Sequence, residues 1–147
     1  MVKRLRELGV EIRSIEAAPW IEDVESRLGF HLPNSYRALV TCYAFPVLEF
    51  DAVELFGNQG NNSRYDITSA PFRDRIMSTW LSANRLLHIG HPYIGNYDPI
   101  CLDLQSTAAD PPIVRLDHED ILLERKKVRR SGVANNLIEL LQTVQRA

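Results

Sequence analysis

The segment from Ile21 to Tyr36 reads IEDVESRLGFHLPNSY, and it predicts two short helices separated by a tight break. Pro19 suits the first turn of a helix, and Gly29 can adopt the left-handed conformation that ends one. We therefore expect the first helix over residues 19–28. Its apolar side chains recur at helical spacing and form one face, which consists of Trp20, Ile21, Val24 and Leu28.

The second helix is expected to begin at Pro33, directly after Leu32, and to end before Pro46. Proline fits the start of a helix, where its missing N–H is not needed, but it cannot continue the hydrogen-bond ladder further along. The apolar positions of this segment again share one face, at Tyr36, Leu39, Val40 and Tyr43. Two helices with such faces are predicted to pack on a common core.

Short strands and one inserted helix are predicted after these two helices. Apolar runs bounded by turn residues predict strands at residues 53–56, 86–89, 100–104, 113–116 and 121–128. The inserted helix is expected over residues 71–84, where the helical stripe contains Phe72, Ile76 and Trp80, with Met77, Leu81 and Ala83 beside it.

The chain is expected to end in a helix that follows Ser131 as its N-cap. Its apolar stripe consists of Val133, Leu137, Leu140, Leu141 and Val144. This order of elements predicts a single α+β domain over residues 1–147. The domain should contain a largely antiparallel mixed sheet of about five to six strands, packed with N-terminal, inserted and C-terminal helices.

Composition is that of an ordinary soluble globular protein. Of the 147 residues, 45% are hydrophobic and 24% are charged, and no apolar run approaches the roughly 20 residues that a membrane span needs. The first residues contain no hydrophobic region of a signal peptide, so we expect a cytoplasmic location. Cys42 and Cys101 lie in apolar surroundings without CxxC spacing, and both are expected to be reduced and buried.

Charge is distributed unevenly along the chain. Residues 15–56 carry seven acidic side chains against two arginines. Residues 121–130 carry five basic side chains against one glutamate. The net charge of −2 therefore conceals an acidic region followed by a basic region, and the chain is electrostatically polarised along its length.

Three segments together resemble the SUKH superfamily, which includes cell-wall regulators of the Smi/Knr type. They are the helix pair at 21–36, the turn and strand GNYDPICLDL at 95–104, and VRLDHE at 114–119 ahead of the C-terminal helix. The resemblance extends from about residue 18 to the end of the chain. The residues that carry it are expected to be structural, and they are Trp20, Ile21, Leu28, Gly29, Leu32, Pro33, Tyr36, Gly95, Asp98, Ile100, Asp103, Asp117 and His118.

The resemblance implies a protein-binding module. Bacterial members of the superfamily commonly act as immunity proteins that neutralise toxins, many of them nucleases, whereas fungal members act as scaffolds. We expect a cognate toxin as the partner, with a scaffold or regulatory adaptor as the alternative. Carboxylates that attract a basic toxin are the expected contacts, and the candidates are Glu49, Asp51, Glu54 and Asp66. Ordinary solvated charges are the other reading of the same residues.

An enzymatic alternative would gather histidines and aspartates into a metal or acid/base site, from His88, His91, His118, Asp98, Asp103 and Asp117. The spacing of His88 and His91 is weak support, because Gly90 and Pro92 disfavour a helix there and no third ligand has a matching spacing. The chain contains no nucleophile elbow, HExxH motif or dinucleotide fingerprint. We therefore expect no catalytic residues, no cofactor and no bound metal.

A nucleic-acid alternative rests on the sequence RKKVRR at residues 125–130. Five cations in six residues could contact phosphates, but no aromatic side chains accompany them and the whole chain is slightly acidic. A solvated strand edge is the preferred interpretation, because basic edges resist unwanted strand pairing. We expect neither a nucleic acid nor a membrane as partner, and the sequence does not indicate an oligomeric state.

Overall fold

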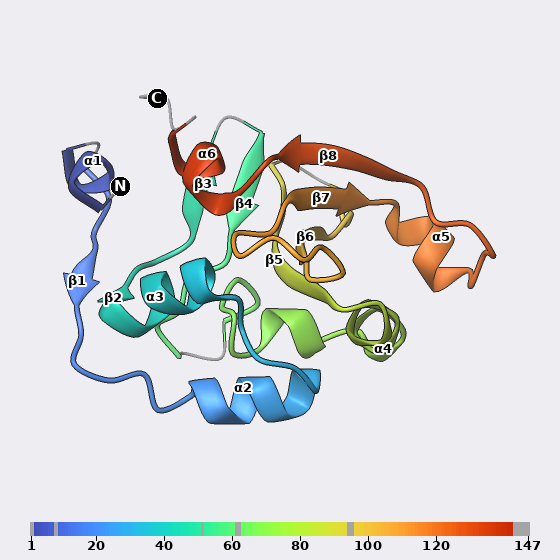
Figure 1. Cartoon of the computed structure of the whole chain (residues 1–147), viewed down its shortest axis with the longest axis horizontal. Helices are drawn as coiled ribbons and strands as arrows, with labels where there is room; N and C mark the ends of the chain where they lie inside the picture. The colour runs from blue at the N-terminus through green and yellow to red at the C-terminus, as the bar shows by residue number, and fades with distance from the viewer. Residues whose placement is uncertain (1, 8, 51, 61–62, 94–95, 143–147) are drawn as a thin grey trace.

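The computed structural model describes residues 2–7, 9–50, 52–60, 63–93 and 96–142 (Figure 1). Its centre is a six-stranded antiparallel sheet in which each strand pairs with the next one along the chain. The strands are β3 (Leu48–Phe50), β4 (Val53–Leu55), β5 (Leu86–Pro92), β6 (Ile100–Asp103), β7 (Ile113–Leu116) and β8 (Arg130–Ala134). This arrangement confirms the predicted α+β class and its largely antiparallel sheet.

Helices and a small second sheet surround this centre. The second sheet pairs β1 (Arg13–Ser14) with β2 (Tyr43–Ala44). The helices are α1 (Val2–Glu7), α2 (Ile21–Leu28), α3 (Asn34–Cys42), the 3₁₀ helix η1 (Ala70–Phe72), α4 (Arg75–Ala83), α5 (His118–Leu122) and α6 (Leu137–Gln142). Figure 1 shows α4 and α5 at the opposite end of the molecule from α1. None of the helices that the structure describes has the length and apolar character needed to cross a membrane.

The first predicted helix corresponds to α2. It ends as expected at Gly29, which has a φ of 82° and donates its N–H to the Glu25 carbonyl. The helix begins at Ile21 rather than at Pro19, and Trp20 packs half-buried against the core. Its buried face consists of Ile21, Val24 and Leu28, as the spacing predicts.

The Glu25 side chain holds the break between α2 and α3. Its Oε2 accepts from the Leu32 N–H at 2.7 Å, and its Oε1 accepts from Arg37 Nη1 at 2.7 Å. Helix α3 begins at Asn34 rather than at Pro33, which precedes it in an extended conformation. The predicted helix is too long at its C-terminal end, because Tyr43 and Ala44 leave the helix to pair with β1.

The central sheet buries both of its faces, each against a different group of helices. Leu87 and Ile89 of β5 belong to a large core that also contains side chains of α2, α3 and α6. Leu86 of β5 belongs to a second core with Met77 and Leu81 of α4. Alternate residues of one strand therefore serve opposite layers, as the two-residue period of a strand requires.

The inserted helix is shorter than predicted and is rotated about its axis. Residues 70–72 form η1, and α4 begins only after Asp74, whose Oδ1 accepts from the Met77 N–H at 2.9 Å. Met77 and Leu81 face the core, whereas Ile76 is 51% exposed. The prediction that Ile76 belongs to the buried face is therefore wrong, and the next residue, Met77, is buried instead.

The predicted strand at 121–128 is wrong, because Asp117 starts a helix just before it. Asp117 Oδ1 accepts from the Asp120 N–H at 2.9 Å and caps α5. The predicted start of the last helix at Ser131 is also wrong, because Ser131 and Val133 lie in β8. Helix α6 follows Asn136, whose Oδ1 accepts from the Glu139 N–H at 2.8 Å, and Val144 lies outside the described residues.

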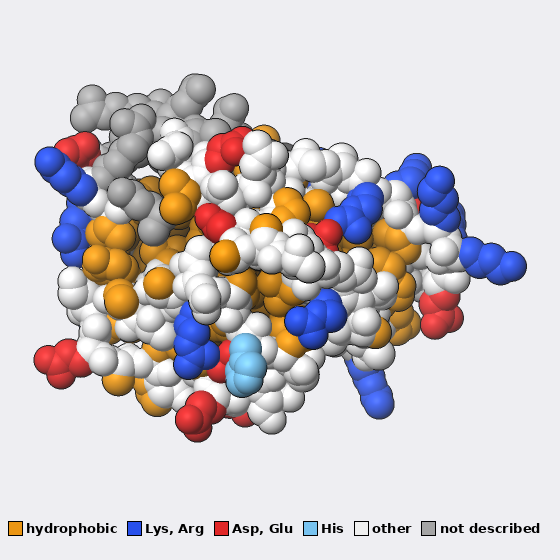
Figure 2. Space-filling model, viewed as in Figure 1, with side chains coloured by type: hydrophobic (Ala, Val, Ile, Leu, Met, Phe, Trp, Pro, Cys, Tyr) orange, Lys and Arg blue, Asp and Glu red, His pale blue; other side chains and the backbone are white. Residues whose placement is uncertain are grey.

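The basic segment before β8 is used partly within the molecule. Asp120 is only 2% exposed and pairs with Arg125 at 2.6 Å and with Arg129 at 2.8 Å. The Arg129 hydrogen bonds hold the pKa of Asp120 well below its usual range. Arg130, the first residue of the edge strand β8, pairs with Asp103 at 2.7 Å. Figure 2 shows Lys and Arg side chains gathered at this end of the molecule.

The two cysteines have different surroundings. Both thiols are free, but Cys101 is buried in β6 whereas Cys42 is exposed at the end of α3. Burial raises the pKa of the Cys101 thiol far above its usual value. The prediction that both are buried is therefore wrong for Cys42.

Strands β4 and β5 meet most closely at Gly90. A Cβ on Gly90 would lie 2.1 Å from the carbonyl oxygen of Glu54, which no real contact allows. Just before this point the pairing of β5 with β6 shifts register between His88 and Gly90, which marks a β-bulge. Gly90 thus allows β4 and β5 to lie closer together than a residue with a side chain would permit.

Replacement Gly90→Ala is expected to lower the free energy of unfolding by about 1–3 kcal/mol, because β4 must move away from the added methyl group. Chemical denaturation measures this change. Gly132→Ala in β8 is the matched control, since nothing lies within 4 Å of its added Cβ. Equal stability of the two variants would contradict the close approach of β4.

Candidate functional site

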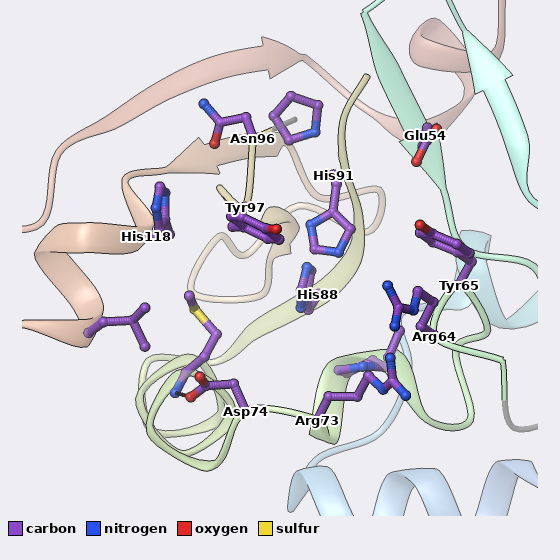
Figure 3. A pocket seen from close by; sticks show the side chains of 15 residues that line it. Glu54, Arg64, Tyr65, Arg73, Asp74, His88, His91, Asn96, Tyr97 and His118 are labelled. Atoms are coloured by element: carbon purple, nitrogen blue, oxygen red, sulfur yellow. Dashed lines mark hydrogen bonds between the residues drawn. The ribbon is translucent and has the colours of Figure 1, made fainter. Parts of the chain in front are cut away.

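A pocket of about 670 Å³ lies between β4, the N-terminal end of α4 and helix α5 (Figure 3). Glu54 of β4 and His88 and His91 of β5 contribute side chains from the sheet. Segments 64–74 and 96–97 and helix α5 supply the remaining walls. The volume is in the range of pockets that bind ligands or a partner's side chain.

The β-bulge places both histidines of β5 on the pocket side. Residues three apart on a regular strand face opposite sides, but the extra residue in the bulge restores His91 to the side of His88. Their ring centroids are 5.0 Å apart, and each ring also meets Phe56 edge to face. Glu54 is the direct cross-strand partner of His91. One carboxylate and two imidazoles therefore lie side by side.

His88 is neutral, and one of its ring nitrogens has no hydrogen-bond partner among the described residues. The ring is 6% exposed, and its Nε2 lies 3.0 Å from the Gly90 carbonyl oxygen. A carbonyl only accepts, so Nε2 carries the hydrogen and Nδ1 carries a lone pair. Among the residues that the structure describes, none is hydrogen-bonded to this Nδ1. Burial and the neighbouring His91 lower the pKa of His88 to about 3.

His91 repeats this arrangement nearer to the surface. Its Nδ1 is buried and has no hydrogen-bond partner in the described part of the chain. Burial lowers the pKa of His91, and a hydrogen bond with the Asp98 backbone opposes this shift only in part. Both rings are therefore neutral near pH 7, and together they present two hydrogen-bond acceptors in the pocket.

Asp98, Arg115 and His118 form a bracing network beside the pocket. Asp98 Oδ2 accepts from Arg115 Nε at 2.8 Å. Asp98 Oδ1 accepts from the His118 backbone N–H at 2.9 Å and lies 2.6 Å from His118 Nδ1. Burial raises the pKa of Asp98, but the hydrogen bonds together outweigh it and leave this pKa below its usual value. The network ties β7 and α5 to the segment before β6, which carries Tyr97.

Two of the predicted partner contacts, Glu49 and Glu54, are direct neighbours on adjacent strands. Glu49 is exposed on the edge strand β3, and Glu54 is half-buried at the pocket. Burial and the charge of Glu49 raise the pKa of Glu54. Directly opposed like charges are unfavourable, so a cation placed there would relieve both carboxylates. Asp51, the third carboxylate predicted for this contact, lies outside the described residues.

Asp66 does not belong to this surface, so that prediction is wrong. The residue is 2% exposed, and its carboxylate is enclosed by donors of its own loop. Its Oδ2 accepts from the Gln59 N–H at 2.7 Å, and its Oδ1 accepts from Thr68 Oγ1 at 2.6 Å. Asp66 thus supports the loop that carries Arg64 and Tyr65 to the pocket.

The remaining motif residues have the structural environments expected for a scaffold. Leu32, Tyr36 and Ile100 are buried in the large core. Asp103 pairs with Arg130, and Asp117 caps α5. Gly95 lies outside the described residues.

The sequence pointed to the two β5 histidines only as candidates for a metal or acid/base site. Among the described residues, no group of three or more His, Cys, Asp or Glu side chains is placed to hold a metal ion. The pocket itself was missed, and so were its tyrosines, Tyr65 and Tyr97. The sequence signal that could have revealed it is Gly90 within an apolar strand, because such a glycine often marks a bulge.

Comparison with known proteins assigns the scaffold. The family model described as the SMI1 / KNR4 family (SUKH-1) matches residues 18–143. The chain belongs to this family. The SUKH-1 match spans the elements from α2 through α6, so the pocket and the Glu49–Glu54 pair lie inside the family domain. No curated protein matches the chain.

The stability of this SUKH-1 chain is expected to fall as the pH drops from about 6.5 towards about 3. His88 binds a proton readily when unfolded but has a pKa of about 3 when folded, so its contribution is complete above pH 6.5 and is lost progressively as the pH falls to the folded pKa. The slope for one such group is up to about 1.4 kcal/mol per pH unit. Denaturation at several pH values should show a smaller slope for His88→Phe than for the wild type; an unchanged slope would contradict the neutral, buried ring.

Proposed function

We propose that this SUKH-1 chain is a non-catalytic protein-binding module, and specifically a bacterial immunity protein that neutralises a cognate toxin by direct binding in the cytoplasm. The observation that carries the proposal is the family match over residues 18–143. A toxin covered at its active site or substrate groove cannot act, and such inhibition requires binding surface rather than chemistry.

The surface around the pocket is suited to such binding. Tyr65 is 41% exposed and Tyr97 is 74% exposed, although tyrosine is a residue that protein interfaces commonly bury. Glu49 and Glu54 add negative charge next to them. Many toxins of this class are nucleases, and carboxylates at the rim of an interface speed association with a basic surface.

The chemistry of the pocket supports a role without catalysis. A general acid or base works best when its pKa is close to the ambient pH, whereas the pKa of His88 is about 3. His118 is engaged with Asp98 in the bracing network. Neutral and paired groups of this kind can contact a partner, but they are poorly suited to transferring protons.

The first test is cell rescue. The gene next to this one should encode a protein that ends in a toxin domain, and co-expression of the present chain should restore growth of cells that produce that domain. A neighbour without a toxin domain, together with capture of an endogenous protein by the chain, would favour a scaffold or adaptor and overturn the immunity proposal.

The second test concerns the acidic pair. Replacing Glu49 and Glu54 together by Gln should slow association with the toxin domain about tenfold at low salt and should flatten the salt dependence of the association rate. Surface plasmon resonance at several salt concentrations measures both quantities. Glu11→Gln with Glu16→Gln is the charge-matched control, because both residues are exposed and lie outside the pocket. Equal rates for the two double variants would dismiss the acidic pair as the contact.

A further inference from the structure

The end of the pocket at β5 contains acceptors without donors. His88 and His91 each have an Nδ1 lone pair that no described residue satisfies. Figure 3 shows the two rings lying between Tyr97 on one side and Glu54 and Tyr65 on the other. A buried acceptor that stays unpaired loses the hydrogen bonds that it makes with water, so this end of the pocket favours a ligand that brings N–H groups.

The charge at the same place favours a cation. Glu54 lies directly across the strand pair from His91, and Glu49 lies directly across from Glu54 on the other side. The two histidines do not offset these charges because burial keeps both rings neutral near pH 7. The carboxylates of Glu49 and Glu54 and the imidazoles of His88 and His91 thus lie on the adjacent strands β3, β4 and β5.

The walls suit a flat or extended cationic group. Tyr65 and Tyr97 present exposed aromatic rings at the pocket, and a guanidinium or ammonium group is attracted to such a ring face. Guanidinium also supplies several N–H donors in a fixed plane, which can serve a carboxylate and an imidazole nitrogen at once.

We propose that the pocket receives an arginine side chain of the protein partner, which donates to Glu54 and to the free nitrogens of His88 and His91. The inference rests on the proposed function, because it names the chemistry by which the module would recognise its partner. Arginine is frequent among the residues that dominate interface energies when they insert into a pocket.

Two arginines of the chain also line the pocket, and they define where the ligand can enter. Arg64 and Arg73 are exposed, and Figure 3 shows both below Tyr65, whereas Glu54 lies above it. Exposed charges are screened by water and salt, whereas the half-buried Glu54 is screened less. The cation should therefore approach from the β4 side, between Tyr65 and Tyr97.

The test uses a small probe in place of the unknown partner. The full chain is titrated with N-acetyl-arginine-N-methylamide and, separately, with the citrulline analogue, which retains N–H donors but has no charge. Nitrogen-15 NMR of the imidazole rings reports directly on the Nδ1 lone pairs. The expected result is a change at His88 and His91 Nδ1 with the arginine probe, at a Kd about tenfold lower than that of the citrulline probe.

Variants assign the interaction to named groups. Glu54→Gln should raise the Kd of the arginine probe about tenfold, to that of the citrulline probe, and His88→Phe should weaken both probes while it keeps the ring packed on Phe56. Glu16→Gln is the matched control, since Glu16 is exposed and outside the pocket. Backbone NMR spectra of each variant verify that it is folded.

Two outcomes would overturn the inference. They are equal affinities for the two probes and chemical-shift changes confined to residues outside the pocket. Rescue of cells from the toxin does not depend on these titrations. A chain that rescues cells but ignores the probe would retain its proposed function and lose only this mode of recognition.

Discussion

The contact between the backbones of β4 and β5 at Gly90 determines the arrangement of the functional face. Glycine permits the carbonyl of Glu54 to lie where a side chain would otherwise stand. The adjacent bulge then turns His91 to the side of His88, and the β4 register places Glu54 opposite His91. The pocket therefore depends on a backbone feature, and its side chains occupy the positions that this feature provides.

Several buried polar side chains of the described residues make their hydrogen bonds within the fold, whereas His88 Nδ1 makes none there. Asn58 accepts from the Phe45 N–H and donates to the carbonyls of Val40 and Tyr43. Asp66, Asp98 and Asp120 accept from loop amides or arginines. These groups stabilise local geometry because each of their bonds is made within the fold. His88 differs from them because it lines the pocket while its Nδ1 has no hydrogen-bond partner among the described residues.

Sequence patterns predicted the elements whose signals are local. Gly29 ends α2 through a conformation that glycine adopts cheaply, and the apolar period of α2 identifies its buried face. The prediction of a strand at 121–128 was wrong because the Asp117 side chain caps a helix there. The prediction rested on the apolar residues alone and did not include this hydrogen bond. The helix after Ser131 was wrong for a non-local reason, since β8 forms by pairing with β7. Partner contacts were predicted from charge alone, and charge does not distinguish the exposed Glu49 from the buried Asp66.

The order of strands in the central sheet also affects how the chain folds. Each of its strands pairs with its neighbour in sequence, so the sheet can grow by adding one hairpin at a time. Closing the short connections from β3 to β4 and from β5 through β7 costs little chain entropy, and proteins rich in near-neighbour contacts fold faster than those that depend on distant pairing. Longer closures are needed for the pairing of β4 with β5 across residues 56–85, for the pairing of β1 with β2, and for the packing of α2 and α3 on the sheet. The meander therefore favours an early nucleus at β5 to β7, and the pocket is completed only when β4 joins it.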